Sequence, residues 1–172
     1  MKKSNLLKIT VLCVFFASFF VEQSMAQGRP DWLAWKWDSW KFVVTGKDIK
    51  KDDYYSLRIG IKHTNNSSSK DVTAIYKKTL TFSATVNNNL TWVTNQGKAV
   101  KKTITSDKIN NIDIWPGNSY TLYYDIPVKD LIPASYGYAS HWENYNKDLA
   151  TQKPGNYFSN TKVTYDCYVK TK

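Results

Sequence analysis

Residues that commonly carry enzyme chemistry are scarce in this chain of 172 residues. There are two histidines, His63 and His141, and two cysteines, of which Cys13 lies in an apolar N-terminal run. Glu143 is the only glutamate beyond residue 22, so a glycosidase would need Glu143 with an aspartate, or two aspartates, and no motif marks such a pair. No Gly-x-Ser-x-Gly elbow or glycine-rich phosphate loop occurs. We therefore expect no catalytic residues, no cofactor and no enzymatic activity.

Metal binding is also disfavoured by the residue pattern. Two histidines and one remaining cysteine cannot build a zinc site without aspartate, and no ligand spacing suggests one. Asp48, Asp52 and Asp53 could bind calcium, but lysines are interleaved with them. We interpret this stretch as a solvated turn and predict no metal site.

His63 and Cys167 both fall on the apolar side of alternating segments. His63 continues the series Tyr55, Leu57, Ile59 and Ile61, which favours a core histidine with satisfied hydrogen bonds over a catalytic one. Cys167 alternates in the same way with valine and tyrosine neighbours. A lone thiol in that position is predicted to be buried and inert.

Aromatic side chains gather in one segment without a predicted strand. More than thirty residues between Pro127 and Thr161 lack a strand pattern, which is long for a structureless loop in a compact domain. Aromatics on such a loop are typical of sugar platforms and of protein-binding hot spots. The alternative is that they pack as a flap over an open end of the fold. The candidate ligand-binding residues are Tyr136, Tyr138, His141, Trp142 and Tyr145, together with Trp32.

The elements that would position these residues are strands. A period of two is clearest over 55–64 and recurs over 79–86, 90–94, 100–104, 120–126 and 162–170. Asn-rich, Asn-Gln-Gly and Pro-Gly-Asn clusters separate them. No stretch after residue 26 sustains a helical period over three turns, although 143–149 allows one helical turn. This pattern predicts an all-β fold, an antiparallel β-sandwich of about seven to eight strands with one long aromatic-rich loop.

The first predicted strand carries an interrupted tryptophan stripe. Trp35 and Trp37 alternate onto one face, whereas Trp40, Phe42 and Val44 fall on the other. One extra residue at 38–39, a β-bulge, would bring all five onto a single buried face. Trp32 precedes this strand, and we expect it to be the most exposed of the four tryptophans.

The N-terminal segment has the features of a secretion signal. Lysines precede an apolar run of 13 residues (9–21), and Ser24 and Ala26 lie three and one positions before a cut ahead of Gln27. We expect residues 1–26 to be a signal peptide and 27–172 a single domain, secreted or held in the periplasm or at the cell surface. No transmembrane segment is expected after cleavage, because the apolar run falls short of the ~20 residues that span a bilayer.

Charge on the processed chain would be strongly positive. It has 21 basic and 13 acidic residues, a net charge of +8, and only Arg29 and Arg58 among the bases are arginine. Nucleic-acid readers favour arginine, so no nucleic-acid partner is expected. Anionic lipid, polyanionic glycan and cell wall are the more plausible counterparts of such a surface.

Two motifs carry a family resemblance. Trp115 to Pro127, a tight Pro-Gly turn followed by an alternating strand, resembles the late strands of bacterial exported Ig-like domains. Tyr55 to Thr64, running into Asn65-Asn66-Ser67, is similar to an early strand of the same domains. The resemblance implies an Ig-like sandwich and a role in adhesion, assembly or ligand binding, while the fold itself fixes no chemistry.

Three functions remain open from the sequence. The first is an exported, non-enzymatic binding or assembly module that meets a protein or glycan at the cell surface through the aromatic loop. The second is a carbohydrate-binding domain that uses Trp142 with Tyr136 or Tyr138 as stacking platforms. The third is a membrane-active protein with Trp and Tyr at the lipid interface.

Overall fold

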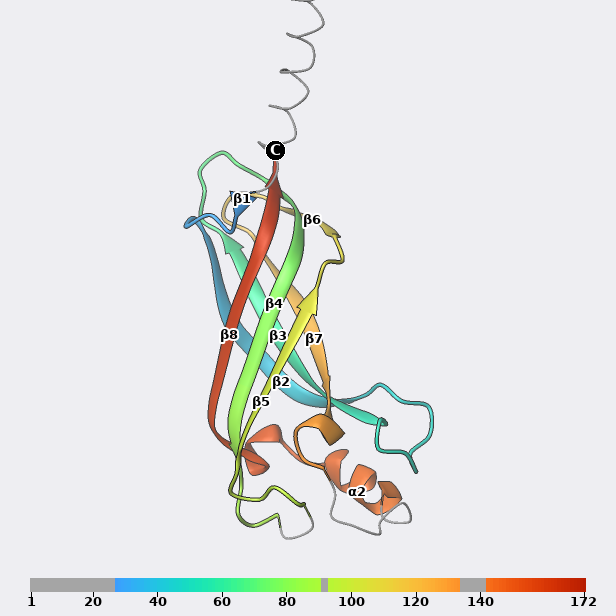
Figure 1. The fold of residues 1–172 in the computed structure, drawn as a ribbon. Helices are drawn as coiled ribbons and strands as arrows, with labels where there is room; N and C mark the ends of the chain where they lie inside the picture. The colour runs from blue at the N-terminus through green and yellow to red at the C-terminus, as the bar shows by residue number, and fades with distance from the viewer. Residues whose placement is uncertain (1–26, 91–92, 134–141) are drawn as a thin grey trace, which may run out of the picture.

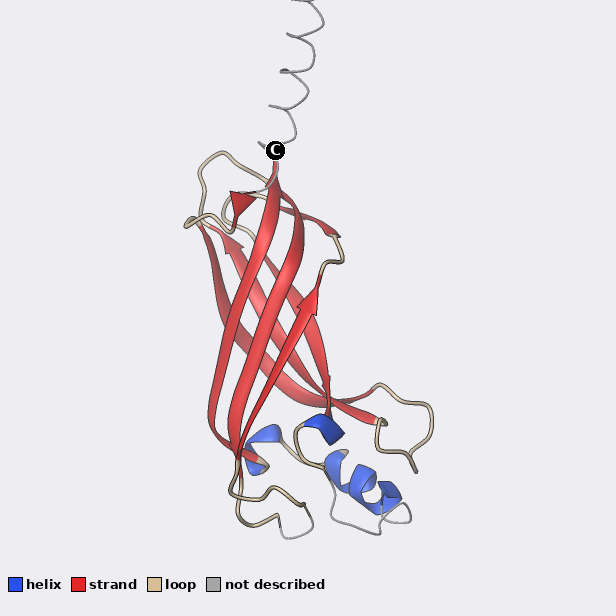
Figure 2. Cartoon of the chain, in the orientation of Figure 1, coloured by secondary structure: helices blue, strands red, loops and turns tan. Residues whose placement is uncertain are grey.

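The computed structural model describes residues 27–90, 93–133 and 142–172. Strands form an elongated body, and the short helices lie together at one end of it (Figure 1, Figure 2). The elements are, in chain order, β1 (Gln27–Gly28), β2 (Leu33–Val44), β3 (Tyr55–Asn65), β4 (Val72–Val86), β5 (Ala99–Ser106), β6 (Asn110–Ile114), β7 (Ser119–Pro127), η1 (Val128–Asp130), α2 (Trp142–Leu149), η2 (Pro154–Asn156) and β8 (Phe158–Thr171). None of the helices in these ranges is long and apolar enough to cross a membrane.

The strands make two antiparallel sheets that pack face to face. One has the order β1-β8-β4-β5, with β6 also paired to β4, and the other has the order β2-β3-β7. This confirms the predicted antiparallel β-sandwich. The helical turn that the sequence allowed over 143–149 is present as α2, and two 3-10 turns that were not predicted, η1 and η2, also lie between β7 and β8.

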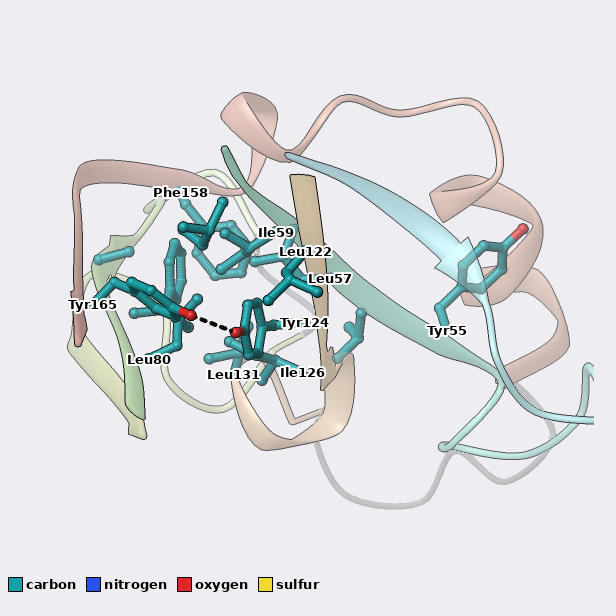
Figure 3. Close-up of a cluster of buried hydrophobic side chains, with 14 of the residues drawn as sticks. Tyr55, Leu57, Ile59, Leu80, Leu122, Tyr124, Ile126, Leu131, Phe158 and Tyr165 are labelled. Atoms are coloured by element: carbon teal, nitrogen blue, oxygen red, sulfur yellow. Dashed lines mark hydrogen bonds between the residues drawn. The ribbon is translucent and has the colours of Figure 1, made fainter. Parts of the chain in front are cut away.

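The core lies between the two sheets. Alternation buries Leu57, Ile59 and Ile61 from the central strand β3, and Leu80 and Phe82 from the central strand β4. Figure 3 shows a cluster of buried side chains in this core, with Leu57, Ile59 and Leu80 among those labelled. Within it the Tyr124 hydroxyl on β7 donates to the Tyr165 hydroxyl on β8 across 3.0 Å. The hydrogen bond therefore joins the two sheets through the centre of the core.

The predicted β-bulge is present in β2. Trp37 is opposite Ile61 and Ser39 is opposite Gly60, so Asp38 is the extra residue. As a result Trp35, Trp37, Trp40 and Phe42 all pack, half-buried, against the core. Val44 does not belong to this stripe, because it lies at the strand's end with 51% of its surface exposed.

Two strand boundaries differ from the sequence prediction. β4 begins at Val72, well before the predicted 79–86 stretch. The sequence did not reveal this first part of the strand because a bulge at Lys77 (φ +44°) interrupts the alternation of apolar residues. The predicted strand over 90–94 does not form in its described residues. Leu90 and Val93 are buried within a connection of turns, and β5 pairs directly with β4 from Ala99 onward.

Candidate functional site

The segment between β7 and β8 covers one end of the sandwich. η1, α2 and η2 lie there, at the opposite end from the C-terminus and β1 (Figure 1). α2 is fixed by Asn146, whose Nδ2 donates to the carbonyl oxygens of Ile49 at 2.6 Å and Lys51 at 3.0 Å. A second link joins Lys129 Nζ to Asp52 Oδ1 at 3.2 Å. The predicted loop is therefore an ordered cover over its described residues.

The aromatic residues of this cover point mainly inward. Tyr157 and Phe158 are buried, and so is Tyr145. Trp142 is half-buried against the core, and its ring centroid lies 5.1 Å from that of Tyr145. A buried ring cannot stack on a ligand, so the packed-flap alternative holds for Tyr145. Of the other predicted residues, Tyr136, Tyr138 and His141 lie outside the described residues.

Trp32 does not share a site with Trp142. It precedes β2, and its carbonyl oxygen accepts a hydrogen bond from the Asn66 backbone at the far end of β3. The 12 residues of β2 separate it from the helical end, which at 3.2–3.4 Å per residue is a distance of roughly 40 Å. Trp32 is half-buried against the core, in the same exposure class as the three tryptophans of β2.

A polar groove opens beside the cover. Its volume is about 460 Å³, and it lies between the β4–β5 connection and the α2–η2 segment. The lining consists of carboxamides, one carboxylate, one tyrosine and small or apolar groups: Asn87, Asn89, Leu90, Asp148, Gln152, Gly155, Asn156 and Tyr157. The sequence pointed only to turns at 87–89, so the groove was missed. The one usable signal was the density of carboxamides in both segments.

Hydrogen bonds hold the two walls of the groove together. The Asn87 backbone N–H donates to Tyr157 O at 2.9 Å, and Asn87 Nδ2 donates to Asn156 O at 3.0 Å. Asn156 Nδ2 in turn donates to Gln152 Oε1 at 2.6 Å. Within the described residues, the Asn89 side chain and the Gln152 Nε2 make no hydrogen bond. These amides are therefore available to a ligand.

Asp148 and Tyr157 set the electrostatics of the groove. The Tyr157 hydroxyl donates to Asp148 Oδ2 across 3.4 Å. Burial and the nearby Asp148 carboxylate raise the pKa of Tyr157, so the phenol stays protonated at neutral pH. The groove thus offers neutral donors and acceptors beside one negative charge. It is suited to holding hydroxyl groups, and its described lining contains no histidine or cysteine.

His63 and Cys167 both lie in the core. Cys167 is buried and unpaired, as predicted, and burial raises the pKa of its thiol to about 11. His63 is also fully buried, but neither ring nitrogen has a hydrogen bond of normal geometry. The predicted core position of His63 is confirmed, and the hydrogen bonds expected for it do not form with normal geometry. Burial lowers the pKa of His63 to about 4, with backbone groups of Tyr120 and Ile61 opposing this only in part.

The aspartates near residue 50 act within the turn. Asp48 Oδ1 accepts the backbone N–H of Lys50 at 2.9 Å, and Asp52 pairs with Lys129. Across the described ranges, no group of three or more His, Cys, Asp or Glu side chains is placed to hold a metal ion.

Comparison of the chain with models of protein families, with curated proteins and with solved structures finds no match.

Proposed function

We propose that the protein is an exported, non-enzymatic binding module whose helical end binds a carbohydrate. The observation that carries this proposal is the open groove lined by carboxamides, Asp148 and Tyr157. Its volume of about 460 Å³ falls within the ~300–1,000 Å³ typical of small-molecule sites.

The chemistry of the lining favours a polyhydroxyl ligand. Side-chain amides can donate to one hydroxyl and accept from its neighbour, and a carboxylate can accept from two adjacent hydroxyls. A protein partner would instead be expected to meet an exposed aromatic or arginine anchor. The described groove lining offers neither in exposed form, since Tyr157 is 2% exposed. Because Asp148 would repel an acidic sugar, we expect a neutral oligosaccharide.

A binding role is favoured over hydrolysis by the single carboxylate. Glycoside hydrolysis normally needs two carboxyl groups flanking the scissile bond. Asp148 is the one carboxylate among the described lining residues, and Glu143 pairs with Lys147 at 2.7 Å on α2 instead. Binding would therefore still involve the segment between β7 and β8, but the ligand would lie in the groove and would not stack on exposed aromatic rings.

The test uses a glycan array of neutral oligosaccharides, followed by calorimetry on the best hit. Asn89→Ala and Gln152→Ala remove available amides without touching the hydrogen bonds from Asn87, and each should weaken binding about tenfold, which is the loss of one good contact. Asn144→Ala is the matched control, because Asn144 is exposed on α2 outside the groove. Melting temperatures should stay unchanged for Asn89→Ala and Asn144→Ala, and Gln152→Ala should lower the melting temperature only slightly, because the hydrogen bond that it loses from Asn156 is exposed.

Two results would overturn the proposal. One is a hit that binds the Asn89→Ala and Gln152→Ala variants as tightly as it binds the unaltered protein. The other is an array without any hit, combined with binding to liposomes, which would favour the membrane-active alternative.

A further inference from the structure

The outward face of the β2-β3-β7 sheet has an unusual distribution of charge. Residues directly opposite in an antiparallel pair point to the same face. Lys36 is opposite Lys62, and Lys41 is opposite Arg58, so two pairs of like charges face each other across β2 and β3. Like charges in this arrangement destabilise a sheet. These two pairs therefore do not stabilise the fold, and another role would explain why the four cations lie opposite each other.

Compensation by acidic residues is partial. Arg58 makes a bidentate pair with Asp125 on β7, with Nε–Oδ1 and Nη2–Oδ2 distances of 2.7 Å. In the described part of the chain, no ion pair involves Lys36, Lys41 or Lys62. Three ammonium groups on this face are thus without an acidic partner.

An exposed aromatic ring lies between the two charged rows. Tyr123 is opposite Gly60, which separates the Arg58 and Lys62 positions on β3, and 59% of its surface is exposed. A Cβ on Gly60 would lie only 3.2 Å from Tyr123 Cε1, so the glycine leaves space for the ring against the sheet. The Arg58 guanidinium carbon lies 5.8 Å from the ring centroid. The result is a ring presented to solvent and flanked by cations.

The outward face of the other sheet has no two cations directly opposite each other in its described pairs, although Lys77 Nζ lies 5.3 Å from the centroid of the Tyr168 ring. Lys101 and Lys162 both lie opposite Ser83, one on each side, so the serine separates them. Threonines surround them, and the Thr81 and Thr103 hydroxyls are 2.9 Å apart. The two faces therefore carry lysines in different settings, which provides an internal control.

We infer that the outward face of the β2-β3-β7 sheet binds an acidic polysaccharide. Sulfate or carboxylate groups would meet the unpaired lysines and relieve their mutual repulsion, while Tyr123 would stack on the CH face of a sugar ring. A membrane is less suited to this face, because Tyr123 is its one exposed large apolar side chain in the described residues. Nucleic acid is disfavoured because three of the four cations are lysine. This site is separate from the groove and from its neutral ligand.

The probes are dextran sulfate and polygalacturonate, with uncharged dextran as the matched control polymer. We expect both acidic polymers to bind, with affinity that falls as salt is added, and uncharged dextran not to bind. The double variant Lys36→Gln/Lys62→Gln should weaken binding at least about tenfold. The control double variant, Lys101→Gln/Lys162→Gln, removes the same charge and should change the affinity less than about twofold. Tyr123→Ala should weaken polygalacturonate binding, and Tyr123→Phe should retain it.

Folding is checked on the same variants. Lys36→Gln/Lys62→Gln removes a repulsion, so its melting temperature should equal or exceed that of the unaltered protein. Equal losses in the two double variants would show unspecific attraction to a basic protein and would overturn the inference. Tighter binding of single-stranded DNA or of anionic phospholipid vesicles through the same residues would overturn the choice of ligand. Groove variants such as Gln152→Ala should leave acidic polymer binding unchanged, which separates this test from that of the proposed function.

Discussion

His63 makes the stability of the protein sensitive to acid. Its ring lies in the core with the centroid 5.2 Å from that of Tyr165, and burial holds its pKa at about 4, below the ordinary 6.5. Between these two values the unfolded chain binds the proton and the folded chain does not. The unfolding free energy is therefore not reduced by His63 above pH 6.5, and it falls as the pH is lowered from 6.5 toward 4. The shift corresponds to about 3 kcal/mol of unfolding free energy.

Replacing His63 by leucine should remove this dependence. We expect urea denaturation of His63→Leu to show a smaller loss of unfolding free energy between pH 7 and pH 4.5 than the unaltered protein shows. At pH 7 the variant should be at least as stable, since the substitution removes two buried nitrogens without hydrogen bonds of normal geometry. Parallel pH profiles for the two proteins would contradict this account of His63.

Trp40 is a second residue with a measurable individual contribution. Its ring lies 6.4 Å from those of Phe82 and Phe158, both in the opposite sheet, and 5.2 Å from that of Trp37. Because Trp40 is half-buried, Trp40→Ala should cost about 3 kcal/mol, at the low end for tryptophan truncation. Trp115→Ala serves as the control, since 61% of Trp115 is exposed, and a change within about 0.5 kcal/mol is typical of such surface sites. A larger drop in melting temperature for Trp115→Ala than for Trp40→Ala would disprove this packing.

At the scale of elements, the bulge in β2 decides which side chains reach the core. Deleting Asp38 would restore strict alternation and turn either Trp35 and Trp37 or Trp40 and Phe42 outward. We expect the deletion to abolish cooperative unfolding in circular dichroism melts. Asp38→Ala keeps the extra residue, and its melt should stay cooperative.

The contact between α2 and the 45–54 turn should be equally sensitive. Asn146→Ala removes the hydrogen bonds to the carbonyl oxygens of Ile49 and Lys51, and a typical intramolecular hydrogen bond contributes about 0.5–1.5 kcal/mol to stability. We expect faster hydrogen exchange in α2 and weaker glycan binding at the groove. Asn144→Ala, at an exposed position of the same helix, should change neither.

Elements with a clean period were predictable from the sequence, and irregular ones were not. The alternation in β3 and the extra residue in β2 both follow from the spacing of apolar residues. The first half of β4 escaped prediction because Lys78 is buried there, with its ammonium held by the Lys108 carbonyl oxygen and Asn110 Oδ1. A buried lysine breaks the apolar pattern that marks a strand. α2 was underestimated because it is short and its hydrophobic contacts come from few side chains, the buried Tyr145 and Leu149 and the half-buried Trp142.

At the scale of the whole molecule, the candidate binding surfaces could not be predicted because they join segments distant in the chain. The groove brings residues 87–90 together with 148–157, and its signal in either segment is no more than a polar turn. The charged sheet face depends on strand register, which places Lys36 opposite Lys62. Aromatic content was a poor guide, since most described aromatics between β7 and β8 fill the end of the core.

The pairing of β1 with β8 has a mechanical consequence. Gln27 lies opposite Val169, so both ends of the described chain emerge at one end of the sandwich (Figure 1). A force applied between residues 27 and 172 would first separate the short β1–β8 pair and would then peel β8 away from β4 one hydrogen bond at a time, beginning near the Val72–Thr171 pair. Optical tweezers with handles at Asn88 and Lys172 would load the same β4–β8 pair in shear, because Asn88 follows the far end of β4. Peeling breaks the hydrogen bonds one at a time, whereas shear loads them all together. Because forced unfolding is governed by the unfolding rate, the protein should open at much lower force along the 27–172 axis than along the 88–172 axis.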